Sequence, residues 1–124
     1  MITQLLGSLF RRPPTAVTAN EAHSATQHGP AILLDVREPQ EWQAGHAPQA
    51  RHIPLGQLES RLAELPRDRQ VIAVCRSGRR SALATQQLVA GGYAAINLTG
   101  GMTAWAAADL PVVGGRGRGA GRIR

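Results

Sequence analysis

The stretch "QVIAVCRSGRRSA", residues 70–82, sets the architecture that we expect for the chain. Its first five residues carry no charge and are rich in β-formers, which is typical of a strand covered on both faces. The strand leads to Cys75, the chain's only cysteine, in a short turn with three arginines and a glycine. A helical pattern begins at Arg80, so the stretch predicts a strand, a tight loop and a helix N-terminus.

Further strands and helices are expected on both sides of this stretch. Strands are predicted at 31–36, 50–55 and 94–98. Helices are predicted from a capping box at Thr18 to about His28, at 39–44, 55–65 and 80–90, and from 100 to about 109. Strands that alternate with helices predict an α/β fold with a parallel central sheet flanked by helices on both faces. Sites in such sheets lie beyond the carboxyl ends of the strands, where Asp35 and Cys75 fall.

The composition indicates one globular domain between two terminal segments. With 124 residues, 43% hydrophobic and 18% charged, the chain is long enough to bury a core and does not have a disordered composition. We expect an N-terminal arm over 1–14 that packs apolar side chains on the domain, and the domain itself over 15–112. The tail over 113–124 is rich in glycine and arginine, so we expect it to be flexible and its loss to leave activity intact.

Charge and cysteine content exclude several classes of function. The formal net charge is +6, but four arginines lie in the last nine residues without an acid, which leaves only +2 for the rest. A nucleic-acid-binding body is therefore not indicated. No run approaches the ~20 apolar residues that span a bilayer, so no stable membrane insertion is expected. One cysteine forms no internal disulfide, which fits a reducing compartment, and we expect a cytoplasmic location.

The turn after the central strand surrounds Cys75 with groups that favour negative charge. Loop and helix N–H groups should converge there, together with the positive end of the helix dipole. Gly78 permits a positive φ, and Arg76, Arg79 and Arg80 add positive potential. We expect the pKa of the Cys75 thiol to lie well below the ordinary ~8.5, which makes the thiol a nucleophile. An inert core cysteine would not account for these neighbours.

Two kinds of reaction fit a cysteine in such a loop. Cysteine-loop phosphatases and arsenate reductases have an arginine six positions after the nucleophile, but here that position is Ser81. The nearest arginine is Arg80, so the loop is one residue shorter and should form a tighter cradle. A tighter cradle fits the sulfur of a persulfide better than a tetrahedral phosphate. Sulfur transfer is therefore favoured over phosphatase or arsenate reductase activity.

Three longer stretches carry a resemblance to a known family. They are "LLDVREPQEWQAGHAPQARHIPLGQL", "VCRSGRRSA" and "NLTGGMTAW". Over about residues 15–112 the chain resembles the single-domain rhodaneses, which are thiosulfate:cyanide sulfurtransferases. The resemblance implies a rhodanese-like fold and a catalytic Cys75 that carries sulfur as a persulfide in a ping-pong reaction. It also implies that the charged sulfur is bound by backbone N–H groups of the loop residues Arg76, Ser77, Gly78, Arg79 and Arg80.

The resemblance also implies the chemistry of the partners. The donor would be a small anion such as thiosulfate, attracted by Arg76 and Arg79, and the acceptor would be cyanide or a thiol. A protein that donates sulfur would also be compatible with these positively charged side chains. An alternative from another class is a non-catalytic persulfide relay or sulfur-sensing module that acts with a protein partner. Some rhodaneses continue into membrane helices, so the tail could also be a linker.

Asp35, Arg37 and Ser81 are the expected supporting residues. Ser81 follows the cysteine loop directly, and Asp35 and Arg37 lie at the end of a neighbouring strand. We expect Asp35 to pair with Arg80 or to accept N–H bonds from the loop, and so to hold the loop in shape. The alternative for Asp35 is a surface ion pair of little effect.

Five polar or aromatic side chains between 38 and 52 are expected to have structural roles. Glu38 and Glu41 should stabilise the start of the short helix over 39–44 rather than act as an acid and base. His46 and His52 are six positions apart and do not match a zinc-ligand pattern, so neither a metal nor a cofactor is expected. Trp42 lies on an apolar helix face and is expected in the core.

Overall fold

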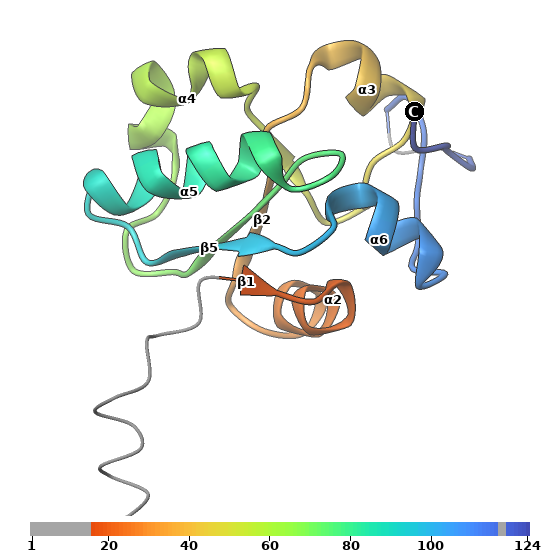
Figure 1. Cartoon of the computed structure of the whole chain (residues 1–124), viewed down its shortest axis with the longest axis horizontal. Coiled ribbons are helices and arrows are strands. Elements are labelled where there is room, and N and C mark those ends of the chain that lie inside the picture. The colour runs from red at the N-terminus through yellow and green to blue at the C-terminus, as the bar shows by residue number, and fades with distance from the viewer. Residues whose placement is uncertain (1–15, 117–118) are drawn as a thin grey trace, which may run out of the picture.

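The computed structural model describes residues 16–116 and 119–124. Its centre is a parallel sheet with the strand order β1-β5-β4-β2-β3 (Figure 1). The strands are β1 (Ala16–Val17), β2 (Ile32–Asp35), β3 (Arg51–His52), β4 (Val71–Val74) and β5 (Ala95–Leu98). The predicted α/β fold with a parallel central sheet is confirmed.

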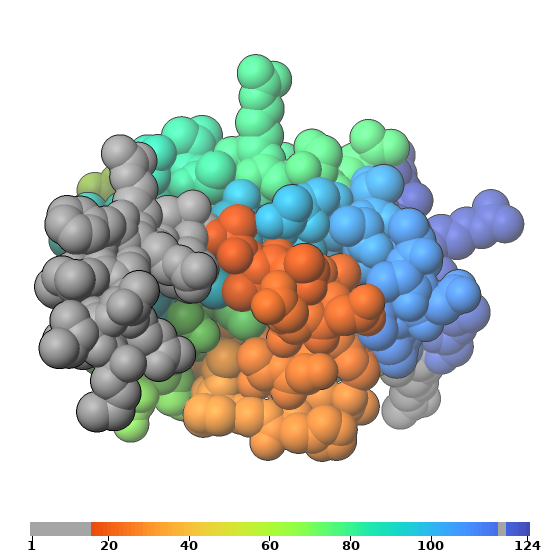
Figure 2. Space-filling model, turned by 60° about the horizontal axis from the view of Figure 1, so that its bottom comes forward, coloured from red at the N-terminus to blue at the C-terminus, as the bar shows by residue number. Residues whose placement is uncertain are grey.

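Helices connect the strands and cover both faces of the sheet. α2 and α6 are neighbours on one face, which Figure 2 shows from the outside. α4 and α5 lie together on the other face, and α3 follows β2 beyond its carboxyl end (Figure 1). The helices are α2 (Ala19–Gln27), α3 (Pro39–Ala44), α4 (Leu55–Arg61) with a 3₁₀ turn η1 (Leu62–Glu64), α5 (Arg79–Ala90) and α6 (Gly101–Ala107).

Local signals account for most of these boundaries. The capping box that begins α2 is present, since the Glu21 amide donates to Thr18 Oγ1 and the Thr18 amide donates to Glu21 Oε1. The helix predicted over 55–65 is α-helical only to Arg61 and then tightens into η1. β1 was not predicted, because it contains only two residues. The expected N-terminal arm over 1–14 lies outside the described residues.

Side chains of alternate strand residues pack into two apolar clusters, one on each face of the sheet. Leu33 and Ile72 pack with Trp105 of α6 on the first face. Leu34 and Ala73 pack on the second face under α4 and α5. Because β2, β4 and β5 are parallel neighbours, their carboxyl ends lie at one edge of the sheet. In residues 16–116 and 119–124, no helix is long and apolar enough to cross a membrane.

The described part of the C-terminal segment lies against the end of α3. His46 and Val113 exchange two backbone hydrogen bonds of 2.9 Å, and the Arg122 amide donates to the Ala44 carbonyl at 2.7 Å. The Ile123 side chain packs against the apolar cluster that contains Trp105. The flexibility predicted for residues 113–124 stays a prediction, but the described residues of this segment have a defined place in the fold.

The substitution Gly45→Ala tests whether this docking contributes to stability. An added Cβ at Gly45 would overlap the backbone of Arg122, so the C-terminal segment would have to move away. We expect a loss of about 1–3 kcal/mol in the free energy of unfolding, as for other overpacked sites, and faster tryptic cleavage after Arg116. Gly56→Ala is the matched control, because a Cβ there meets nothing within 4 Å. Equal stability of the two variants would show that the docking contributes nothing.

Candidate active site

Cys75 lies directly after β4 and before α5, as the sequence predicted. The residue is only 1% exposed, and its Sγ accepts two hydrogen bonds. The Gly78 amide donates at 3.1 Å and the Ser81 hydroxyl at 3.2 Å. Gly78 is the N-cap of α5 and has a φ of 115°, which favours glycine because it has no Cβ. The loop therefore turns its amide and the first turn of α5 toward the sulfur.

Hydrogen bonds to the sulfur lower the pKa of the Cys75 thiol. Burial is the largest single influence and raises the pKa, but the donors acting together outweigh it. The donors are the Ser81 hydroxyl and the amides of Ser81, Gly78 and Ser77. The structure therefore agrees with the predicted lowering of the pKa of the Cys75 thiol. The leading causes, however, are these hydrogen bonds rather than the guanidinium charges of the loop.

Backbone amides at the start of α6 donate hydrogen bonds to the carbonyls of the cysteine loop. The Met102 amide donates to the Cys75 carbonyl at 2.8 Å, and the Thr103 amide donates to the Arg76 carbonyl at 3.1 Å. Gly101 allows this close approach, because its φ is 59° and an added Cβ would overlap both carbonyls. These contacts use the loop carbonyls and leave the loop amides free to face the sulfur.

Asn97 of β5 is a site residue that the sequence reasoning missed. Its Oδ1 lies 2.5 Å from Ser81 Oγ, and its Nδ2 donates to the Gly78 carbonyl at 3.0 Å. The amide thus contacts both residues whose donors touch Cys75 Sγ. The signal that could have found Asn97 is its place near the carboxyl end of β5, which is the strand next to β4.

Arg80 pairs with Glu41 rather than with Asp35, so the predicted Asp35–Arg80 pair is wrong. Arg80 Nη1 and Nη2 donate to the two Glu41 carboxylate oxygens at 2.6 and 2.9 Å. The hydrogen bond from Arg80 lowers the pKa of Glu41 to about 2, against the opposing effect of burial. Glu41 also caps the start of α3 through the Glu38 amide, as predicted. It therefore joins α3 to the start of α5.

Asp35 instead forms a buried ion pair with Arg37. Both side chains are 0% exposed, and Arg37 Nη2 lies 2.7 Å from Asp35 Oδ2. Arg37 Nη2 also donates to the Gly45 carbonyl at 2.7 Å. The one backbone N–H that donates to the Asp35 carboxylate among the described residues is that of Arg37, so the predicted bonds from the cysteine loop are absent there. The pair braces the segment that carries Glu41, and its effect on the loop is indirect.

Glu41→Gln tests the link between α3 and α5. A carboxylate whose pKa is lowered by folding stabilises the protein above its unfolded pKa of about 4.5, and this contribution is lost as the pH falls toward about 2. We expect the loss of stability across that pH window to be smaller in Glu41→Gln than in the wild type. Denaturant unfolding of both proteins at several acidic pH values measures the difference. Parallel pH profiles would contradict the assigned pair.

The aromatic side chain of Trp42 lies between two histidine rings. The Trp42 and His46 rings are 3.6 Å apart and almost parallel, and the Trp42 and His52 rings are 4.7 Å apart. Trp42 is half-buried, so the expectation that it belongs to the core is wrong. His46 Nδ1 lies 2.8 Å from the Trp42 carbonyl and His52 Nε2 lies 2.7 Å from the Arg37 carbonyl. Both histidines thus have the structural role that was predicted.

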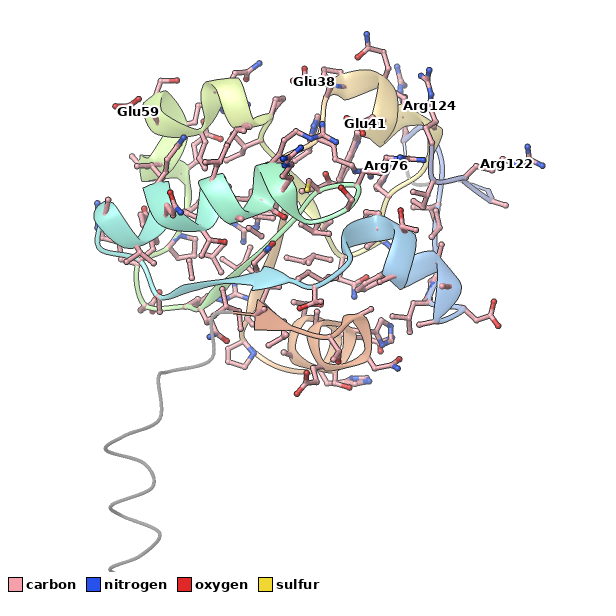
Figure 3. All side chains as sticks on the ribbon, in the orientation of Figure 1. Glu38, Glu41, Glu59, Arg76, Arg122 and Arg124 are labelled. Atoms are coloured by element: carbon pink, nitrogen blue, oxygen red, sulfur yellow. The ribbon has the colours of Figure 1, made fainter. Side chains whose placement is uncertain are left out.

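Two exposed guanidinium groups remain at the mouth of the site. Arg76 and Arg79 are exposed, whereas Arg80 is 34% exposed and engaged by Glu41. Arg76 Nε donates to the Arg124 carbonyl of the docked C-terminal segment. Figure 3 shows Glu41, Arg76 and Arg124 at the same edge of the molecule. An anion that approaches this edge would meet Arg76 and Arg79 first.

Comparison with known proteins agrees with this arrangement. Residues 18–108 match the family described as Rhodanese-like domain. A sulfurtransferase from Allochromatium vinosum is 41% identical over 87 residues, which cover 69% of this chain and 81% of that protein. A rhodanese-related protein from Thermoplasma volcanium is 30% identical with a TM-score of 0.74, and the match covers 79% of this chain and 96% of that one. A rhodanese-like domain protein from Staphylococcus aureus is 32% identical with a TM-score of 0.69, over 73% of this chain and 90% of that one. The chain therefore belongs to the family of rhodanese-like domains.

Proposed function

We propose that the chain is a sulfurtransferase that carries a sulfane sulfur on Cys75, taken from thiosulfate or a similar anionic donor. Family membership and the relative named sulfurtransferase support sulfur transfer in general. The observation that carries the proposal is the pair of donors on Cys75 Sγ, the Gly78 amide at 3.1 Å and the Ser81 hydroxyl at 3.2 Å. These donors favour an anionic sulfur at the start of a helix.

The proposed reaction has two steps with balanced bonds. The Cys75 thiolate attacks the outer sulfur of thiosulfate, a bond forms between Sγ and that sulfur, and the old sulfur–sulfur bond breaks. Its electron pair leaves with sulfite. Cyanide or a thiolate then attacks the outer sulfur of the persulfide, and Cys75 Sγ leaves as a thiolate. The loop amides stabilise the negative charge in both steps, in the manner of an oxyanion hole.

The roles of the loop arginines differ in this proposal. Arg76 and Arg79 are exposed and attract the donor by charge, whether the donor is thiosulfate or an acidic patch of a protein that delivers sulfur. Arg80 is held by Glu41 and shapes the loop. Ser77 contributes its amide rather than its exposed side chain.

Steady-state kinetics with thiosulfate and cyanide test the proposal. We expect thiocyanate to form, with parallel lines in double-reciprocal plots when both substrates are varied, because sulfite leaves before cyanide reacts. Intersecting lines would indicate that both substrates bind together and would contradict the persulfide route. Absence of thiocyanate at every cyanide concentration tested would contradict the thiosulfate:cyanide activity.

A further inference from the structure

The side chain of Ser81 has one hydroxyl proton but two acceptors within reach. Cys75 Sγ lies 3.2 Å from Ser81 Oγ, and Asn97 Oδ1 lies 2.5 Å from the same oxygen. A hydroxyl donates one hydrogen bond at a time. The proton therefore points either to the sulfur or to the amide, and each choice leaves the other acceptor without it.

The orientation of the Asn97 amide follows from its second contact. Asn97 Nδ2 donates to the Gly78 carbonyl at 3.0 Å. A flipped amide would place Oδ1 against that carbonyl, and two oxygens without a proton between them repel. Oδ1 is therefore the atom that faces Ser81 Oγ, and it can only accept.

We propose that Asn97 is a positioning residue whose side-chain carbonyl competes with Cys75 Sγ for the single proton of the Ser81 hydroxyl. When Cys75 is a neutral thiol, the Ser81 proton lies toward Asn97 Oδ1. When Cys75 ionises, its own proton goes to solvent and the Ser81 hydroxyl turns to the thiolate. Asn97 then loses its donor. The competition keeps the thiolate from being stabilised too strongly, and a thiolate of higher basicity is the better nucleophile.

Charged groups near the sulfur do not account for an effect of Asn97 on the ionisation of Cys75. β5 and α6 present no titratable side chain there, since their sequences are AINL and GMTAWAA. On the loop and α5, Arg76 and Arg79 are exposed and Arg80 is paired with Glu41 of α3. At the end of β2, Asp35 and Arg37 form the buried ion pair. None of these charges changes when Asn97 is replaced, so their influence on Cys75 cancels between variants.

Alkylation of Cys75 by iodoacetamide as a function of pH measures the effect directly, because the chain has no other thiol. The midpoint of the profile reports the pKa of the thiol. We expect Asn97→Ala to lower the midpoint by about half to one pH unit, since Ser81 becomes free to donate to the thiolate. The plateau rate should fall about two- to threefold, because the thiolate is less basic. Ser24→Ala is the control, since it removes an exposed hydroxyl on α2, on the opposite face of the sheet from α5.

A double-mutant cycle with Ser81→Ala tests whether Asn97 acts on Cys75 through the Ser81 hydroxyl. Ser81→Ala should raise the midpoint, and Ser81→Ala with Asn97→Ala should have the same midpoint as Ser81→Ala alone. A midpoint that rises or stays unchanged in Asn97→Ala would overturn the proposal, as would a further shift in the double variant. Folding should survive, because Gly78 O keeps its bond from the Ala82 amide. Asn97→Leu, which keeps the volume, serves as the second variant.

The wild-type protein offers a test that needs no substitution. The carbon shift of the Asn97 side-chain carbonyl should change at the same pH midpoint as the alkylation of Cys75, because the hydroxyl donor leaves at that point. A shift that is constant through this midpoint would contradict the competition. The inference deepens the proposed function, but its tests use only the ionisation of Cys75. A failure of sulfur transfer would therefore leave the Asn97 result intact, and the reverse also holds.

Discussion

Cys75→Ser is expected to lose transfer of sulfur from thiosulfate, down to the level of the uncatalysed reaction. The serine hydroxyl does not ionise at neutral pH even with the Gly78 and Ser81 donors beside it, so no anionic nucleophile forms. Thiocyanate formation from thiosulfate and cyanide measures the loss. The fold should be retained, because serine fills nearly the same volume and meets the same donors. Circular dichroism and denaturant unfolding check that point.

A control variant separates this result from a general effect of mutation. Ser24→Ala removes an exposed hydroxyl on α2, on the opposite face of the sheet from α5, and should retain full activity. Substantial sulfur transfer by a folded Cys75→Ser protein would contradict the assigned nucleophile. Release of phosphate from an aryl phosphate, lost in the same variant, would instead favour the phosphatase alternative.

Asp35→Ala is expected to have the largest effect on stability. It leaves the Arg37 guanidinium buried at 0% exposure with its carboxylate partner removed. Removing one member of a buried ion pair costs about 3–5 kcal/mol in the free energy of unfolding. Sulfur transfer should fall but persist at temperatures where the variant is folded, because Asp35 does not contact Cys75. Unfolding curves and turnover at low temperature measure the two effects.

Two further variants test the cause of this loss. The double variant Asp35→Leu/Arg37→Met removes both charges and should recover much of the lost stability. Glu64→Ala breaks the exposed Arg61–Glu64 pair and should have little effect. If Asp35→Ala changed neither stability nor turnover, the bracing role would be refuted.

Most of the fold was predictable from local sequence patterns. Short, mainly apolar runs at 31–36 and 70–74 become β2 and β4, and both strands are fully buried. Helix start signals at Thr18 and Pro39 are confirmed by α2 and α3. β1 was missed because a pair of residues cannot show a period, and its pairing with β5 depends on contacts distant in sequence.

The active site was predictable where it is contiguous in sequence. The loop from Cys75 to Arg80 was recognised because the strand, the turn and the helix start follow one another within a few residues. The contacts from Glu41 to Arg80 and from Asn97 to Ser81 join residues that are far apart in the chain. Glu41 already had a sufficient local role as a helix cap, and nothing local distinguished Asn97 from an ordinary strand residue.

In the folded chain, hydrogen bonds to the sulfur are the main cause that lowers the pKa of the Cys75 thiol. Loop and helix amides, the helix dipole and the three loop arginines were all expected to lower the pKa of the thiol. In the folded chain, Glu41 neutralises Arg80, and Arg76 and Arg79 are exposed to solvent, where charge is screened. Hydrogen bonds at 3.1 and 3.2 Å act on the sulfur over a shorter distance. Sequence shows which charges are near, but only the fold shows which of them are paired.

Intact mass spectrometry after incubation with thiosulfate tests the central claim most directly. The claim is that Cys75 forms and shelters a persulfide. The account predicts that the wild-type protein gains the mass of one sulfur atom, that cyanide removes it, and that Cys75→Ala gains nothing. An unchanged mass of the wild-type protein, or the same gain in Cys75→Ala, would contradict it.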